Sequence, residues 1–234
     1  MRLNLHQLAR LGLAGLLLSQ AACTPSETEV SASLGEYRDG VITFYVEADG
    51  TGNCSFDATP FDLDVAALIK TEWENSAVCG ACAEVEGPLG TVRVRIVDSC
   101  PDCETPGHLD LSPSAFEKVA RRVDGRVNVR WRFVSCPVSG PIRYRTKEGS
   151  SQYWTALQVL NHHVPIRELA WWKDGQWVRV QREDYNYFVE PAGMGEGPIK
   201  VRVTSWDGQV LEDTLPNANG GQTFEGRAQF SPLP

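Results

Sequence analysis

The second half of the chain carries short runs in which apolar and polar residues alternate, separated by turn residues. Alternation with a period of two is typical of β-strands that bury one face. The steps Asp174-Gly175 and Asp207-Gly208 lie between runs and favour tight hairpin turns. The predicted strands cover residues 142–146, 154–160, 166–172, 177–181, 199–206, 209–214 and 224–230. This spacing predicts an all-β sandwich.

The first half mixes strands with one helix. Residues 91–97 and 127–134 are strand-like, whereas residues 113–121 form a predicted helix that begins with Ser112 as N-cap and Pro113 as its first residue. A breaker-rich stretch follows the second strand and places a boundary near Ser139. We therefore expect two β-rich domains, over residues 33–138 and 139–234.

The N-terminus has the composition of a signal peptide over residues 1–22. Arg2 and Arg10 supply positive charge, and the apolar run 11–18 is too short to span a bilayer as a helix. Small residues follow at 19–22, where cleavage would occur. We therefore expect an exported protein.

Cys23 directly follows this segment, as in bacterial lipoproteins, although Gln20 stands where such sites usually carry an apolar residue. Lipidation of Cys23 and plain cleavage are both open, and the cysteine count favours lipidation. The sequence has seven cysteines, an odd number. If Cys23 carries a lipid, six cysteines remain, which suits three disulfides in an oxidising compartment. Residues 23–32 read as a solvated tether. The protein is expected to be secreted or lipid-anchored at the bacterial cell surface or outer membrane.

Acidic residues outnumber basic ones, and the formal net charge is −8. Residues 33–138 contain 10 basic and 17 acidic residues, and residues 139–234 contain 10 basic and 11 acidic residues. Neither half has the basic character that phosphate backbones require, so nucleic acid is not an expected partner, and acidic wall polymers would be repelled.

The most informative motif lies between the predicted strand at residues 91–97 and the predicted helix at residues 113–121. Asp98 and Asp110 stand at the two ends of a short loop that also contains Cys100 and Cys103. Because a helix is predicted to begin directly after Ser112, we expect Asp110 to end a strand at the edge of a cleft. Two carboxylates at one edge indicate polysaccharide chemistry or polysaccharide binding.

These residues resemble the catalytic-like domain of expansins, relatives of the barwin proteins and the family-45 endoglucanases. The resemblance extends over Gly40-Val-Ile-Thr43-Phe-Tyr45, over Lys147 to Trp154 and over Asp184-Tyr185-Asn186. Within the family, the chain is most similar to bacterial expansins. It implies a mainly β fold, a six-stranded double-psi β-barrel followed by an immunoglobulin-like β-sandwich. It also implies no cofactor, and a monomer is expected.

The resemblance assigns roles in the first domain. The aspartate that matches Asp110 protonates the departing glycosidic oxygen in the related enzymes and is needed for wall loosening in expansins. Asp98 is its expected orienting partner, and Thr43 and Tyr45 are expected to line the same groove. The alternatives are a helix-capping role for Asp110 and a structural role for Asp98. Cys100 stands where some bacterial relatives carry a tyrosine, which removes one aromatic contact to sugar.

Hydrolysis requires a second carboxylate that activates water. The related endoglucanases place this base two residues after their Thr-Xaa-Tyr, and Glu47 has that offset here. However, Val46-Glu47 replaces the Trp-Asp of the enzymes, and residues 49–52 resemble the expansin loop, so a solvated loop glutamate is the favoured interpretation.

Six cysteines allow fifteen connectivities, which the spacing does not resolve, and the two Cys-x-x-Cys pairs also have the spacing of zinc ligands. Disulfides are favoured over zinc in an exported protein, and no metal is expected. Resemblance to plant expansins implies Cys54 with Cys79 and Cys82 with Cys136, which leaves Cys100 with Cys103.

In the second domain, Tyr153, Trp154 and Tyr185 match three aromatic residues that form a flat sugar-stacking strip in bacterial expansins, with Lys147 beside them. Strand aromatics are more often core, and consecutive strand residues face opposite sides, so a bend near residues 149–151 is required. The other tryptophans are expected mainly to pack: Trp171, Trp172, Trp177 and Trp206.

The sequence therefore predicts a non-hydrolytic expansin that binds cellulose-rich plant cell walls and associated glucans and loosens polysaccharide contacts. Two alternatives stay open. One is a β-1,4-glucan hydrolase with Asp110 as acid and Glu47 as base, and the other is a passive carbohydrate-binding protein.

Overall fold

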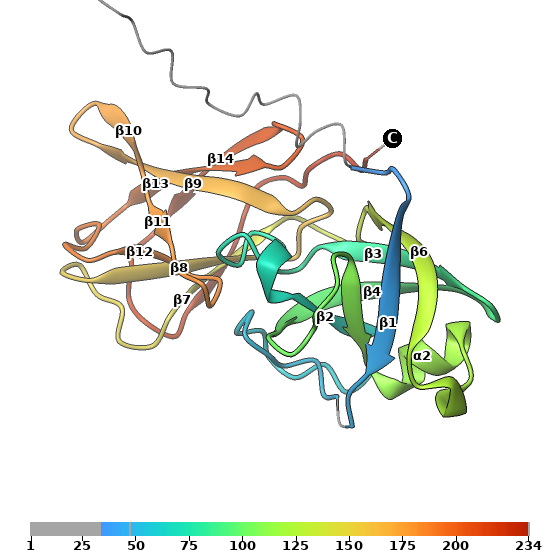
Figure 1. Ribbon diagram of the computed structural model, residues 1–234. Helices are drawn as coiled ribbons and strands as arrows, with labels where there is room; N and C mark the ends of the chain where they lie inside the picture. The colour runs from blue at the N-terminus through green and yellow to red at the C-terminus, as the bar shows by residue number, and fades with distance from the viewer. Residues whose placement is uncertain (1–33, 47, 234) are drawn as a thin grey trace, which may run out of the picture.

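The computed structural model describes residues 34–46 and 48–233, which form a barrel and a two-sheet unit lying side by side (Figure 1). The predicted signal peptide, Cys23, the tether and Glu47 lie outside the described residues. Among the helices of the described part, none is long and apolar enough to cross a membrane.

The first unit is a closed six-stranded barrel of mixed direction, the predicted double-psi β-barrel. Its strands are β1 Arg38–Phe44, β2 Val65–Ile69, β3 Cys82–Gly87, β4 Gly90–Cys100, β5 His108–Leu111 and β6 Val127–Val134. They close in the order β1-β5-β2-β4-β3-β6, with β1 parallel to β5 and β2 parallel to β4. Fully buried side chains such as Ile42, Leu68 and Ile96 belong to the core, as in other small barrels.

One α-helix, α2 Pro113–Val119, follows β5 directly. The Ser112 hydroxyl accepts a hydrogen bond from the Ala115 N–H at 3.3 Å, and Pro113 opens the first turn, as its missing N–H allows. The helix ends at Val119 because Ala120 is extended. Two short 3-10 turns, η1 Lys70–Glu72 and η2 Arg122–Asp124, complete the barrel unit.

The second unit consists of two β-sheets. Its strands are β7 Arg143–Thr146, β8 Thr155–Leu160, β9 Ile166–Lys173, β10 Gln176–Arg179, β11 Gln181–Arg182, β12 Phe188–Glu190, β13 Ile199–Ser205, β14 Val210–Leu215 and β15 Thr223–Glu225. One sheet has the order β10-β9-β13-β14 and the other β11-β12-β8-β7-β15. The alternation did not predict β12, because three residues are too few to establish a period. The predicted boundary near Ser139 falls between β6 and β7.

Three disulfides join Cys54 to Cys79, Cys82 to Cys136 and Cys100 to Cys103. This is the pairing that the family resemblance implied, and it leaves none of the six thiols as a zinc ligand. Within the described ranges, no three His, Cys, Asp or Glu side chains cluster as a metal site would require.

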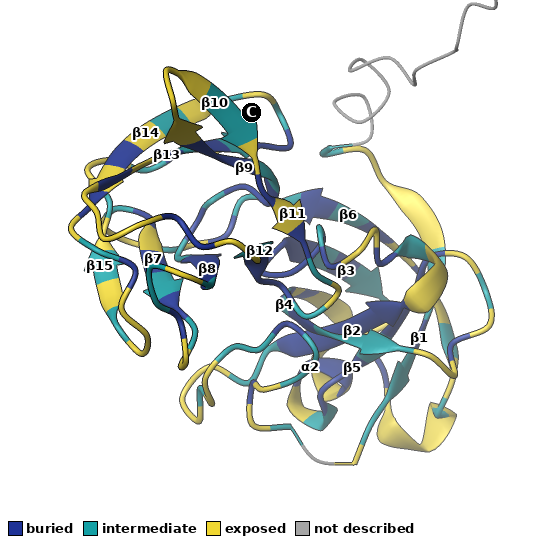
Figure 2. Ribbon diagram, turned by 90° about the vertical axis from the view of Figure 1, so that its left-hand side faces the viewer, coloured by how far each residue is buried: buried dark blue, intermediate teal, exposed yellow. Residues whose placement is uncertain are grey.

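Residues of both units are buried where the two units meet (Figure 2). Phe133 of β6 packs edge-on against Trp206, with 5.3 Å between the ring centroids, so the barrel and the sheets are in direct apolar contact.

Candidate functional site

Four residues on neighbouring strands of the barrel lie in one row. Thr43 of β1 is paired with Asp110 of β5, Asp110 with Ala67 of β2, and Ala67 with Asp98 of β4. Directly paired residues of adjacent strands project from the same face of a sheet. Thr43, Asp110 and Asp98 are partly exposed, whereas neighbouring Ile42 and Leu109 are buried. The row therefore lies on the outer face, with the small Ala67 between the two carboxylates.

A β-bulge contributes to this alignment. Ala66 of β2 pairs with Ile96 of β4, but Ala67 pairs with Asp98, so Val97 is the extra residue. The bulge shifts the register by one residue and brings Asp98 into the row.

Asp110 is half-buried in β5, and the Thr43 hydroxyl donates to its Oδ1 at 2.5 Å. Burial raises the pKa of Asp110 above its ordinary value, although the Thr43 hydrogen bond and nearby His108 act in the opposite direction. The raised pKa favours the protonated carboxyl group, which is the form that a general acid in glycosidic cleavage requires.

His108 is a site residue that the sequence reasoning missed. Its Nε2 lies 3.0 Å from the Thr43 hydroxyl, and it stands two residues before Asp110 on the same face of β5. Because the single hydroxyl proton of Thr43 is donated to Asp110, Nε2 of His108 must carry the proton that Thr43 accepts. The buried Nδ1 has no hydrogen-bond partner among the described atoms, and burial lowers the pKa of His108. The i, i+2 spacing from Asp110 was the available signal.

Asp98 is held by backbone amides. The N–H groups of Asn53 and Ser99 donate to its Oδ1 at 2.7 and 2.8 Å. Gly52 lies against this carboxylate so closely that a Cβ would be 2.6 Å from the Asp98 Cβ, which excludes a larger residue there. Asp98 thus anchors the loop that contains residues 49–53.

Tyr45 continues β1 and donates its N–H to the Leu111 carbonyl at 3.2 Å. Burial, together with the charges of Asp98, Asp110 and Asp49, raises the pKa of its phenol to about 12. The phenol therefore stays protonated and can donate a hydrogen bond next to both carboxylates.

In the second unit, Tyr153 occupies the tip of a tight turn. Ser151 and Trp154 form an isolated bridge, with the Ser151 N–H donating to the Trp154 carbonyl at 2.7 Å. Tyr153 is 75% exposed. The predicted bend is thus closed by residues 151–154 themselves, so strict strand alternation does not separate Tyr153 from Trp154.

Lys147 lies beside the remaining aromatics. Its Nζ is 5.9 Å from the ring centroid of Tyr185 and 5.2 Å from that of Tyr187, and the two rings are 5.9 Å apart. Tyr187 is a second residue that the sequence reasoning missed, since it is buried beneath Tyr185 and Lys147 rather than exposed. Trp154 directly precedes β8, and Tyr185 precedes β12, the strand that pairs with β8.

The packing expectation for the other tryptophans needs one correction. Trp171 and Trp206 are buried, whereas Trp172 is 42% exposed because it faces the outer side of β9. Its ring meets Trp177 edge-on at 5.2 Å, and Lys200 and Arg202 lie over the Trp177 ring at 5.0 and 4.1 Å. Glu212 pairs with both cations, which lie over the Trp177 ring, whereas Trp172 stays partly exposed.

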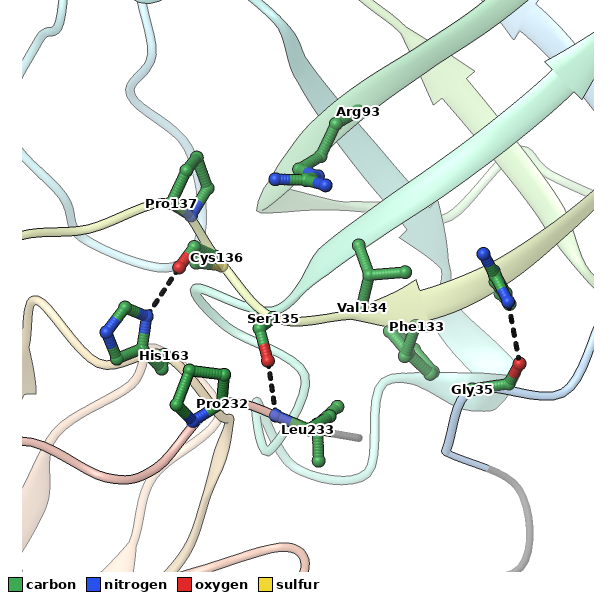
Figure 3. A pocket seen from close by; sticks show the side chains of 11 residues that line it. Gly35, Arg93, Phe133, Val134, Ser135, Cys136, Pro137, His163, Pro232 and Leu233 are labelled. Atoms are coloured by element: carbon green, nitrogen blue, oxygen red, sulfur yellow. Dashed lines mark hydrogen bonds between the residues drawn. The ribbon is translucent and has the colours of Figure 1, made fainter.

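A cavity of about 410 Å³ lies at the junction of the two units (Figure 3). The Leu233 N–H donates to the Ser135 hydroxyl at 2.6 Å, and His163 Nδ1 is 2.6 Å from the Cys136 carbonyl. Neither the row on the barrel nor the aromatic residues of the second unit line this cavity, so it is separate from the candidate site.

Comparisons with known proteins show which family this chain resembles. A family model described as lytic transglycolase matches residues 65–131, within the barrel. Expansin-YoaJ of Bacillus subtilis is 36% identical over 86% of this chain and 90% of its own length. Expansin-like protein 1 of Dictyostelium discoideum is 30% identical over 92% of this chain and 80% of its own length.

Solved structures agree as well. The crystal structure of the apo expansin of Clavibacter michiganensis matches with a TM-score of 0.77 and 34% identity, over 85% of this chain and all of that one. An Asp-to-Asn variant of the same protein, in complex with cellohexaose, matches equally well. With the fold, the disulfides and the Thr43–Asp110 pair in place, this similarity over most of both chains means that the chain belongs to the expansin family.

Proposed function

We propose that this protein is a non-hydrolytic expansin that binds cellulose-rich plant cell walls and loosens the contacts between polysaccharides. The observation that carries the proposal is the row of Thr43, Asp110, Ala67 and Asp98 on an outer face of the barrel. A half-buried acid with a raised pKa lies there on a partly exposed surface, and the small side chain of Ala67 separates it from Asp98.

The arrangement of Asp98 supports a non-hydrolytic role. An inverting glycosidase needs a base carboxylate about 6.5–9.5 Å from the acid that is free to activate water. Two backbone amides engage Oδ1 of Asp98, so this group is suited to hold a loop rather than to accept a proton from water. Glu47, the other candidate base, lies outside the described residues, so activity measurements must decide the hydrolase alternative.

The aromatic residues of the second domain, 139–234, support binding to a neutral glucan. Tyr153, Trp154 and Tyr185, with Lys147 beside them, offer flat rings, and flat rings suit the apolar faces of β-linked glucose. The domain has 10 basic and 11 acidic residues, so its charge balance is only −1. Cellohexaose in complex with the related Clavibacter protein fits the same substrate class.

The export expectations belong to this proposal. We propose that the mature protein starts at Cys23, carries a lipid there and reaches the cell surface as a monomer, with the barrel domain over residues 33–138. Mass spectrometry of the mature N-terminus distinguishes a lipidated Cys23 from plain cleavage.

The test pairs a wall-creep assay under constant load with a reducing-sugar assay on the same wall samples. We expect the mature protein to extend or weaken cellulosic walls without sugar release, and Asp110→Asn to abolish this while cellulose binding stays nearly intact. Sustained release of cello-oligosaccharides that depends on Asp110 would establish the hydrolase instead. Binding without any creep would establish a passive binding protein.

A further inference from the structure

Three consecutive residues of the barrel domain adopt left-handed backbone conformations. The φ angles of Glu74, Asn75 and Ser76 are 47°, 52° and 66°. Residues other than glycine rarely adopt this region, and each such residue costs free energy that the surrounding structure must offset. A run of three points to a backbone shape that serves a purpose beyond closing a loop.

This turn holds the segment that carries Tyr185. The Asn75 side-chain amide donates to the Arg182 carbonyl, and the Ser76 hydroxyl donates to the Glu183 carbonyl at 2.7 Å. The same hydroxyl accepts from the Asn186 N–H at 3.1 Å, and Ser76 is fully buried.

Other barrel residues hold the next two carbonyls. The Trp73 indole N–H and the Asn53 side-chain amide both donate to the Asp184 carbonyl at 3.0 Å, and the Ser55 hydroxyl donates to the Tyr185 carbonyl at 3.0 Å. Four consecutive carbonyls, from residue 182 to residue 185, therefore accept hydrogen bonds from the other domain. The Cys54–Cys79 disulfide ties together the two loops that supply these donors.

We propose that these five barrel residues, Asn53, Ser55, Trp73, Asn75 and Ser76, form a clamp that positions the Tyr185 ring for stacking on a glucan chain. The proposal rests on the proposed role of Tyr185 in cellulose binding. Tyr185 is attached to the second domain by the chain, but its backbone is placed by the first.

The clamp also links the two parts of the candidate site. The backbone N–H of Asn53 donates to Asp98, and its side chain donates to Asp184, next to Tyr185. One residue thus connects the carboxylate row with the aromatic strip, which lets a single glucan chain meet both at a constant spacing.

The test substitutes Asn75→Gly and compares it with Asn161→Gly. Both asparagines have left-handed φ angles, 52° and 57°, and both donate from the side-chain amide to backbone carbonyls, but Asn161 bonds to Ser139 and Pro141. Glycine accepts these φ angles, so both variants keep the backbone and lose only the amide. Affinity for cellohexaose is measured by calorimetry, and stability by thermal unfolding.

We expect Asn75→Gly to weaken cellohexaose binding about threefold to tenfold, the contribution of one partly misplaced ring, whereas Asn161→Gly leaves binding unchanged. Adding Asn75→Gly to Tyr185→Ala should cause no further loss, because the ring that the clamp positions is absent. Adding Asn75→Gly to Trp154→Ala should weaken cellohexaose binding by the same factor as Asn75→Gly does in the wild-type protein.

Three results would overturn the clamp. If Asn75→Gly and Asn161→Gly lose cellohexaose affinity equally, in step with a lower melting temperature, the five residues would contribute only to general stability. A full further loss in the Tyr185→Ala background would show that Asn75 does not act through that ring. Unchanged binding in Tyr185→Ala itself would remove both the aromatic site of the proposed function and the clamp that serves it.

Discussion

At the scale of single residues, Asp110 is governed by two opposing influences. Burial at the row raises its pKa, and the hydrogen bond from Thr43 lowers it. His108 adds a third constraint, because its Nε2 proton fixes the direction in which the Thr43 hydroxyl points. The chemistry of the acid is therefore set by burial and by two side chains, Thr43 of β1 and His108 of β5.

The raised pKa of Asp110 predicts a pH dependence of stability. Between the ordinary value of 3.8 and the higher folded value, the native state binds more protons than the unfolded state. The contribution of this group is therefore fully present below the ordinary value and is lost as pH rises through the folded pKa. Urea unfolding should show that wild-type stability relative to Asp110→Asn decreases as pH rises through this window. A difference that stays constant would contradict the raised pKa.

Thr43→Val should raise the pKa of Asp110 further, because the substitution keeps the shape and removes the hydroxyl that stabilises the carboxylate. Carbon-13 NMR titration of the side-chain carboxyl measures this directly. Thr214 is an exposed strand residue of the other domain. Thr214→Val therefore serves as the control and should leave the pKa of Asp110 unchanged. A pKa of Asp110 that falls in Thr43→Val would refute the hydrogen-bond assignment.

At the scale of elements, the two sheets of the second domain carry aromatic residues with different tasks. Trp154 and Tyr185 lie just before β8 and β12, two paired strands of one sheet, and Tyr153 occupies the exposed turn before Trp154. The sheet containing β9 and β10 carries Trp172, which is 42% exposed, and Trp177, whose ring lies beneath Lys200 and Arg202. Tyr153 is 75% exposed, more than Trp172, so we expect sugar to stack on the aromatic residues of the first sheet.

Replacing Tyr153, Trp154 and Tyr185 together with Ala should weaken binding to crystalline cellulose by at least about tenfold, since each stacked ring contributes ~0.5–1.5 kcal/mol. Pull-down isotherms measure the loss. Trp172→Ala is the matched control on the other sheet and should bind normally. Trp171→Ala should act through stability, at about 3–5 kcal/mol for a buried tryptophan.

The same isotherms test whether charge contributes. Stacking is short-ranged, whereas attraction between surface charges is screened beyond ~10 Å at 0.1 M salt. Raising NaCl should therefore change the affinity of the wild-type protein by less than about twofold. If moderate salt strips the protein from cellulose, a basic surface assembled from distant residues would be the better explanation.

At the scale of the whole molecule, buried hydrogen bonds join the two domains. The Gln158 and Asn186 amides both donate to the Cys54 carbonyl across the junction, at 2.8 and 3.2 Å. His162 is buried close to Gly80 of the barrel domain. Burial and the Arg182 guanidinium lower the pKa of His162 to about 4.

His162 therefore predicts acid sensitivity of the junction. Between pH 6.5 and about 4 the unfolded state binds a proton that the native state does not, so stability is fully present above pH 6.5 and falls as the pH drops. Relative to His162→Gln, the wild-type protein should lose about 3 kcal/mol of unfolding free energy between pH 7 and pH 4. Chemical denaturation at each pH measures this, and a pH-independent difference would contradict it. The sign is opposite to that expected for Asp110.

Local patterns in the sequence determined much of this protein. Alternation located most strands, and Ser112 with Pro113 located the start of α2, because strand period and helix capping depend on near neighbours. The motif around Asp98 and Asp110 carried the resemblance to expansins, and the family comparison bears it out. The aromatic strip and the roles of the two carboxylates stay predictions.

The tertiary structure decided what depends on register and on contacts between distant segments. A one-residue bulge at Val97 brings Asp98 into the row with Asp110, and no periodicity of β4 alone encodes its register against β2. Neighbouring Trp171 and Trp172 have the same local sequence, yet packing against β13 and the core buries only the first. The clamp on Tyr185 joins residues more than a hundred positions apart. Such pairings arise from the way strands close into a barrel and sheets pack on it, which no local window of sequence contains.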